Sequence, residues 1–218
     1  MFNSAGTCDT GTAIPRPRTF AQELATALSG LDCVLNGEKA LYASAELTTG
    51  RLLYRLLREH GLHSTAELKA ALGDEEYRRR VWDPNLAGAL ALARDLRQRF
   101  PGELVVTPAP YLIEGWTQTE YLTLWETVLR TRIKALYLSD DWEYSNGCAF
   151  EFAVAVDACL PTFDAAGRPL KHRDGRRRIE RAAGDLESGG FDVSGLRASL
   201  ARIAAAEPAG PPLIPIRL

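Results

Sequence analysis

A carboxylate stands inside an apolar segment of this chain. Glu151 follows Gly147 by four positions, and its neighbours from Ala149 to Val156 are otherwise alanine, valine and phenylalanine. Burying a carboxylate costs free energy unless the group is paired or is needed for a reaction. As a structural residue in the first turn of a helix, Glu151 would favour the helix dipole or close a capping box with Cys148. These residues alone leave both interpretations open.

A polar and aromatic run, SDDWEYSNG at residues 139–147, directly precedes this segment. It contains two neighbouring carboxylates, Asp140 and Asp141. Apolar walls beside such a pair raise the pKa of one member, and two carboxyl groups with different pKa values can serve as acid and base. The run ends in Ser145 and Asn146, which are residue types that begin helices. The pattern indicates chemistry in a loop that leads into a helix.

The elements on either side place this loop at the edge of a sheet. Lys134 to Leu138 is a short, mostly apolar run typical of a buried strand, and Cys148 to Leu160 is an apolar helix. In an open α/β sheet, ligands bind beyond the carboxyl ends of the strands, where the next helix offers free backbone N–H groups. We therefore expect residues 139–147 to lie at a ligand site.

The spacing of these residues resembles the signature of a known family. The pattern D-W-x-x-S-x-G-x-x-x-E, between a strand and a helix, is similar to that of the nucleoside 2-deoxyribosyltransferase superfamily, which includes nucleotide N-glycosidases. It is carried by Asp141, Trp142, Ser145, Gly147 and Glu151, about a tenth of the chain. The resemblance implies a flavodoxin-like fold and cleavage or transfer at the N-glycosidic bond of a nucleoside or nucleoside 5′-monophosphate.

The resemblance also implies roles for single residues. Glu151 would be the nucleophile on the anomeric carbon, and Asp141 would assist proton transfer, with Asp140 as the alternative. Trp142, Ser145, Asn146 and Gly147 would contact the substrate. Cleavage of an N-glycosidic bond builds positive charge on the sugar, which a carboxylate can stabilise or trap covalently, while a second acid helps the base to leave. No cofactor and no metal is implied.

Two aromatic positions complete the set of candidate site residues. The family's first strand ends in a tyrosine, for which Tyr42 is the candidate, although Ala43-Ser44-Ala45 replaces the customary Gly-Pro after it. A strand tyrosine with a solvated hydroxyl is the alternative. Trp116, near Tyr111 and Tyr121, could stack on a base, whereas core packing is the structural interpretation of the same cluster.

The rest of the chain reads as alternating strands and helices. Such an order predicts a three-layer α/β/α fold with a central, mainly parallel sheet of flavodoxin or Rossmann type. The further strands are expected at 33–35, 40–43, 103–107 and 161–163. The further helices are expected at 19–30, 49–60, 65–72, 83–100, 117–129 and 191–206. Residues 65–80 are interpreted as a helical insertion, and Gly175 as the turn of a hairpin.

Composition bounds the organisation and location of the protein. Residues 19–206 are expected to form a single domain, after a flexible arm at 1–18 rich in Gly, Ser, Thr and Pro and before a Pro-rich tail at 207–218. The formal charge of −2 argues against a general nucleic-acid binder. Four cysteines without metal-like spacing, no export signal and no long apolar run favour a cytoplasmic protein without a membrane span.

Two basic runs leave alternatives open. Arg78 to Arg80 and the segment 168–181 are most simply solvated faces, but either could bind a phosphate, and the second could bind an acidic partner. For the whole protein the alternatives to an enzyme are a catalytically inactive nucleotide-binding or protein-interaction module of the same fold, and a flavodoxin-like domain for another phosphate ligand. A homo-oligomer is expected in each case.

Overall fold

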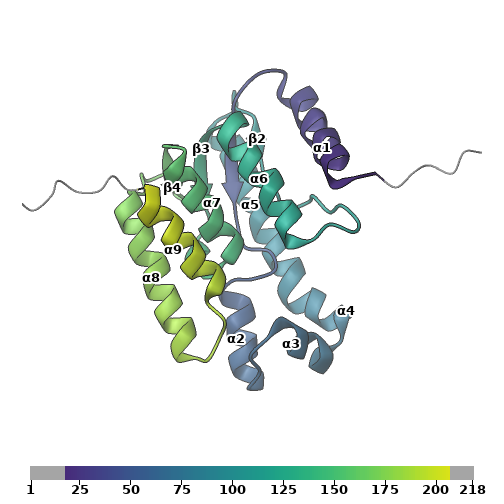
Figure 1. Ribbon diagram of the computed structural model, residues 1–218, viewed down its shortest axis with the longest axis vertical. Helices are drawn as coiled ribbons and strands as arrows, with labels where there is room; N and C mark the ends of the chain where they lie inside the picture. The colour runs from purple at the N-terminus through teal and green to yellow at the C-terminus, as the bar shows by residue number, and fades with distance from the viewer. Residues whose placement is uncertain (1–17, 207–218) are drawn as a thin grey trace, which may run out of the picture.

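Four parallel strands form the centre of the molecule (Figure 1). The computed structural model describes residues 18–206, within which the strands are β1 (Ala40–Ser44), β2 (Val105–Val106), β3 (Ile133–Leu138) and β4 (Thr162–Asp164). Their order in the sheet is β2-β1-β3-β4, and each neighbouring pair is parallel. The chain passes from β1 to one neighbour, β2, and then crosses to β3 on the other side. The strand order therefore reverses between β1 and β3.

Helices cover both faces of this sheet. Ala43 of β1 belongs to an apolar cluster with α5 (Asp83–Arg99) on one face. Tyr42 points to the other face, because side chains alternate along a strand, and there the core includes α6 (Gln118–Arg132) and α7 (Asn146–Asp157). The predicted three-layer α/β/α fold with a parallel central sheet is confirmed.

The other helices pack around these layers (Figure 1). α1 (Phe20–Leu35) lies on α6, α9 (Ser194–Ala206) lies on α7, and α8 (His172–Ser188) lies beside α9. The connection from β1 to α5 consists of α2 (Arg51–His60), α3 (Thr65–Leu72), α4 (Asp74–Tyr77) and the π-helical turn η1 (Arg78–Trp82). A 3₁₀ turn, η2 (Trp142–Tyr144), precedes α7. Of the predicted arm at 1–18 only Arg18 is described, and the tail at 207–218 lies outside the described residues.

The first helix is longer than its sequence indicates. α1 continues through Gly30 to Leu35 and ends at Asn36, which adopts a left-handed conformation with φ of 48°. The prediction of a strand at 33–35 was therefore wrong. A helical glycine costs only about 1 kcal/mol relative to alanine, and burial of Leu31 and Leu35 on the core outweighs that cost. The stop signal at Gly30 is weaker than the tertiary contacts beyond it.

The start of α5 also differs from the prediction. Trp82 and Asp83 both have right-handed helical backbone angles, so α4, η1 and α5 form one continuous helical segment from Asp74 onward. Asp83 is not an N-cap, although Pro84 does lie in the first turn of α5. The π-helical turn directly before Pro84 lies where the missing N–H of proline interrupts the regular hydrogen-bond pattern. Strand β2, at two residues, is shorter than the predicted 103–107.

Gly175 lies inside α8 and not at a hairpin turn. The chain reverses earlier, at Gly167 with φ of 83°, and Phe163 and Pro169 form the only antiparallel bridge between residues 18 and 206. Gly175 packs on the ring of Phe152: a Cβ placed there would lie 2.1 Å from its Cζ. Phe152 is fully buried against Trp142, with 4.8 Å between ring centroids, so it has no room to move away.

This contact predicts opposite effects for two glycines of the same helix. Gly175→Ala should destabilise the protein by about 1–3 kcal/mol, because the added methyl group overpacks the core. Gly184→Ala is the matched control, since Gly184 is exposed and has no atom within 4 Å of the added Cβ; it should stabilise by up to about 1 kcal/mol. Urea denaturation measures both changes, and equal unfolding free energies for the two variants would contradict the proposed contact.

Candidate active site

A cavity of about 700 Å³ opens at the carboxyl ends of β1 and β3. Its walls come from Ala45 and residues 47–49 after β1, the loop after β2, helix α6, the first turns of α7 and one face of α9. This position coincides with the reversal of strand order, where open α/β sheets bind their ligands. The volume is in the range of small-molecule sites. The fold therefore creates a cavity where the polar loop was expected to form a ligand site.

Glu151 is the one carboxylate that lines this cavity among residues 18–206. Its side chain is buried, at 6% exposure, and each carboxylate oxygen accepts a hydrogen bond. The hydroxyl of Tyr42 donates to Oε1 at 2.6 Å, and the hydroxyl of Ser44 donates to Oε2 at 2.5 Å. Tyr42 and Ser44 are alternate residues of β1, so both point to the face of the sheet that α7 covers. Strand and helix together fix the carboxylate in one orientation.

Burial dominates the protonation of this group. It raises the pKa of Glu151 to about 7, although the hydrogen bonds from Ser44 and Tyr42 oppose the shift by favouring the ionised form. Burial and the adjacent carboxylate also raise the pKa of the Tyr42 hydroxyl well above its usual value. Cys148 is buried next to Glu151, and burial raises the pKa of its thiol as well. Glu151 is thus the group of this cluster that changes charge near neutral pH.

The start of α7 excludes a capping role for Glu151. Ser145 is the N-cap, and its Oγ accepts the N–H of Cys148 at 3.4 Å. Glu151 is six residues beyond that cap, in the second turn of the helix, so the expectation of a first-turn residue was wrong. The backbone N–H of Ser145, which a capping-box carboxylate would bind, instead donates to the Trp142 carbonyl at 3.0 Å. Tertiary contacts with β1 account for the position of Glu151.

The rim of the cavity at α7 is polar. Ser145, Asn146 and Gly147 line it, and Thr49 binds the Asn146 N–H through its Oγ1 at 3.1 Å. The Asn146 Oδ1 is buried and has no hydrogen-bond partner among the described residues. Gly195 of α9 lies against this amide: a Cβ there would be 2.7 Å from the Asn146 Oδ1. Asn146 therefore holds an acceptor without a partner at the junction of α7 and α9.

The opposite wall is aromatic. Tyr111, from the loop after β2, and Trp125, from α6, meet edge to face with centroids 5.3 Å apart, and Tyr121 lies beside them in the lining. Trp125 also contacts Tyr42, at 5.9 Å between ring centroids. Such surfaces accept flat, apolar rings. A planar ligand held on this wall would have Glu151 within the same cavity.

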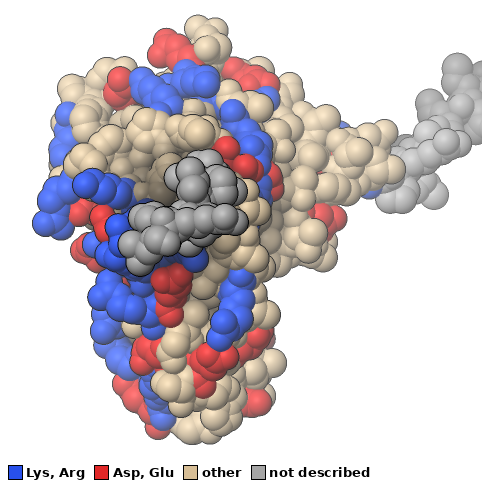
Figure 2. Space-filling view, turned by 60° about the vertical axis from the view of Figure 1, so that its left-hand side comes forward, with Lys and Arg blue, Asp and Glu red and all other residues tan. Residues whose placement is uncertain are grey.

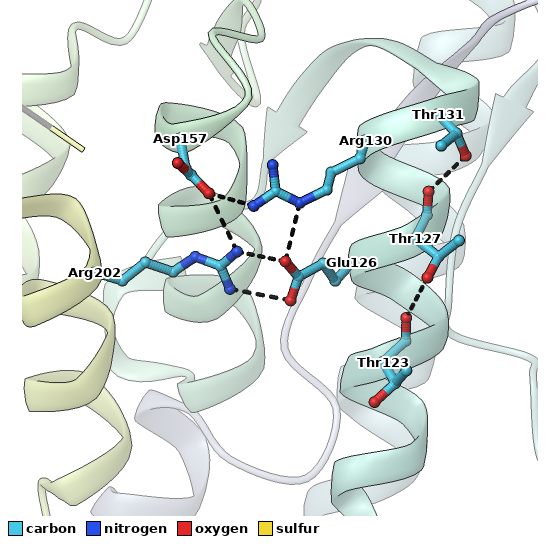
Figure 3. Close-up of polar contacts among 7 residues, drawn as sticks. All are labelled: Thr123, Glu126, Thr127, Arg130, Thr131, Asp157 and Arg202. Carbon is cyan, nitrogen blue, oxygen red and sulfur yellow. Dashed lines mark hydrogen bonds and ion pairs between the residues drawn. The ribbon is translucent and has the colours of Figure 1, made fainter. Parts of the chain in front are cut away.

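Helices α6, α7 and α9 are joined by an ion-pair network beside the cavity (Figure 3). Arg202 of α9 binds Glu126 of α6 with both terminal nitrogens, at 2.5 and 3.1 Å, and its Nη2 lies 3.4 Å from Asp157 of α7. Arg130 of α6 bonds both Glu126 and Asp157. Arg202 also lies over the Phe150 ring, 5.3 Å from its centroid. Its charge is therefore neutralised where it reaches the cavity.

Other predicted site residues lie outside the cavity. Asp141 adopts a left-handed conformation, with φ of 58°, and forms an ion pair with Arg51 at 2.7 Å; Asp140 is exposed. Trp142 is fully buried, so it offers no surface to a ligand, and Trp116 donates its Nε1–H to Glu23 at 2.7 Å, joining α6's loop to α1. Both tryptophans join parts of the fold: Trp142 packs on Phe152 of α7, and Trp116 packs on Phe20 of α1.

Several residues of the site were missed in the sequence. Ser44 could have been found, because it follows Tyr42 by two positions and so shares its face of the strand. Thr49 and Arg202 carry no local signal. Glu46 is half-buried beside the start of α2, and burial, with repulsion from Asp141 and Glu143, raises its pKa to about 8. Glu46 lies far from Glu151 in the sequence, so no local pattern indicated that it would lie near the cavity.

Comparison of the chain with protein-family models, curated proteins and solved structures gives no match. Within residues 18–206 no helix has both the length and the apolar character to span a membrane. In the same range, no three His, Cys, Asp or Glu side chains are grouped so that they could hold a metal ion.

The raised pKa of Glu151 predicts how stability depends on pH. The folded protein holds this proton more tightly than the unfolded chain does. The stability that the protonated group contributes is therefore complete below pH 4.5 and is lost as the pH rises through about 7. Glu151→Gln removes the effect. The variant should gain as much as about 3 kcal/mol relative to wild type between pH 4.5 and 8.

Urea denaturation at several pH values measures this difference. Glu120→Gln is the control of opposite sign, because hydrogen bonds from Thr117 lower the pKa of Glu120 and favour its ionised form in the folded state. For this pair of proteins, the free energy of unfolding of the wild type should increase relative to that of Glu120→Gln as the pH rises. A Glu151→Gln difference that stays constant from pH 4 to 8 would contradict a raised pKa.

Proposed function

We propose that this protein breaks the N-glycosidic bond of a nucleoside or nucleoside 5′-monophosphate, with Glu151 as the nucleophile. The sugar would pass to water or to a second base. One observation carries the proposal: a buried carboxylate in a cavity with an aromatic wall, with both of its oxygens held by hydroxyl donors. Its position at the reversal of strand order supports a ligand site independently of any family resemblance.

The geometry suits attack on a sugar carbon. Each oxygen of Glu151 accepts one hydrogen bond from the protein and keeps further acceptor capacity, so a carboxylate oxygen can approach C1′ while Tyr42 and Ser44 hold the group in place. Departure of the base develops positive charge on the sugar, which the ionised carboxylate stabilises or traps. With a pKa of about 7, a large fraction of Glu151 is ionised at neutral pH.

The walls of the cavity suit a base and a sugar. Tyr111 and Trp125 present aromatic surface to a planar ring, and Asn146 Oδ1 can accept a hydrogen bond from a sugar hydroxyl or a ring N–H. A nucleoside is favoured over its 5′-monophosphate. Arg202 is the one cationic residue lining the cavity within residues 18–206, and its terminal nitrogens are bound to Glu126 and Asp157.

Proton donation to the leaving base is the less defined step. Asp141 can act only if its carboxylate leaves Arg51, to which it is bound at 2.7 Å outside the cavity. Glu46 has a pKa of about 8 and so carries a proton at neutral pH, and its neighbours Ala45 and Leu47 line the cavity. We propose Asp141 for this role after release from Arg51, with Glu46 as the alternative donor.

Release of free base is the direct test. Wild-type protein incubated with a panel of nucleosides and their 5′-monophosphates should release base, detected chromatographically, and Glu151→Gln should lose turnover by a factor of about 10³ or more. The variant should still bind substrate, as a ligand-dependent thermal shift. Binding without base release by the folded wild type would instead support an inactive nucleotide-binding module. Neither binding nor release would exclude both functions.

The pH dependence of base release tests the hydrogen bonds to Glu151. The rate should rise with pH through an inflection near 7, as Glu151 ionises. Ser44→Ala and Tyr42→Phe should move this inflection to higher pH, because each removes a donor that favours the ionised form. Ser139→Ala is the matched control: the Ser139 Oγ is buried without a partner among the described residues. Equal inflections in all four proteins would contradict the assignment of the titration to Glu151.

A further inference from the structure

Four arginines on α8 have no acidic partner within residues 18–206. Arginines elsewhere, such as Arg51, Arg132 and Arg202, form ion pairs with aspartate or glutamate. On α8 the described residues provide no such partner for Arg173, Arg177, Arg178 and Arg181. With 3.6 residues per turn, these positions fall within an arc of about 140° on one side of the helix. Unpaired positive charge is therefore concentrated on one face of α8.

Three of these arginines line a groove. Arg177, Arg178 and Arg181 face the segment that joins β4 to α8, and the groove between them has a volume of about 890 Å³. Arg168, on the opposite side, is held by Asp164, which accepts its backbone N–H at 2.8 Å and its Nε–H at 2.7 Å. The groove shares no lining residue with the cavity at Glu151. It is a separate site.

The guanidinium groups of these arginines are open to a ligand. Arg177 and Arg181 are exposed and Arg178 is half-buried. Among the described residues, none of their side-chain nitrogens is a buried polar atom without a partner. Guanidinium groups bind phosphate oxygens in pairs of parallel hydrogen bonds, so adjacent arginines one helical turn apart can hold neighbouring phosphates.

We infer that this groove binds a compact oligophosphate group. Figure 2 views the molecule from the side of α8, and Lys and Arg side chains gather on the left of that face with acidic side chains among them. Asp164, Asp174 and Glu180 also line the groove, so a bound anion must concentrate its charge at the arginines and keep clear of these carboxylates. The formal charge of −2 for the whole chain also disfavours a long nucleic acid. A short, highly charged ligand can contact the arginines, whereas an extended polyanion in the groove would also pass the carboxylates.

Calorimetric titration with inorganic tripolyphosphate tests the inference. Wild-type protein should bind it at low salt, more tightly than orthophosphate, and added salt should weaken binding. The double variant Arg177→Gln/Arg181→Gln should lose about tenfold or more in affinity. The matched control is Lys39→Gln/Arg94→Gln, which removes the same charge from two exposed side chains that lie off α8 and do not line the groove. It should bind like wild type.

Three results would overturn the inference. No binding of tripolyphosphate to folded wild-type protein would exclude the site. An equal loss of affinity for tripolyphosphate in the two double variants would show that net charge alone causes the binding. Tighter binding of a single-stranded oligonucleotide through Arg177 and Arg181 would identify an extended nucleic acid in place of a compact ligand. Thermal melts confirm that each variant folds, and Arg178→Gln gives an independent variant of the same groove.

Discussion

The hydrogen bonds from Tyr42 and Ser44 to Glu151 connect strand β1 to helix α7, which follows the neighbouring strand β3. They bring together residues more than a hundred positions apart in the chain. A carboxylate buried in this way would be costly without donors for both oxygens. The fold meets that requirement by placing alternate residues of β1 under α7. The orientation of Glu151 in the cavity and the balance between burial and hydrogen bonding that sets its pKa depend on this arrangement.

The rest of the site surrounds that carboxylate. α6 contributes the aromatic Trp125, α9 contributes small residues such as Gly195, and the ion pairs of Arg202 join these helices beside the opening. Close packing sets the distances. Gly175 lets α8 approach Phe152, which in turn packs on Trp142 below the loop after β3. The residues that shape the cavity therefore extend beyond those that line it.

Charge is distributed differently at the two sites. Within residues 18–206, the one cation that lines the cavity is neutralised by Glu126 and Asp157, which leaves Glu151 as the lining group whose charge varies. On α8, arginines that have no acidic partner in the described part of the chain border an open groove. The first environment suits a neutral, partly aromatic molecule, and the second suits a concentrated anion. The two environments therefore differ in the kind of ligand that each would suit.

The sequence alone determined the layer architecture, because strand and helix periodicities depend on local hydrophobic patterns. A local signal, a carboxylate in an apolar segment, also singled out Glu151, while the family resemblance pointed to Tyr42, and the structure joins the two by a hydrogen bond. Tertiary structure alone decided that Ser44 is the second donor, that Asp141 pairs with Arg51 outside the cavity, and that Trp142 belongs to the core. Those outcomes depend on contacts between distant segments, as does the passage of α1 through Gly30 and of α8 through Gly175. Local propensities near 1 kcal/mol are too small to fix such positions against burial in a packed core.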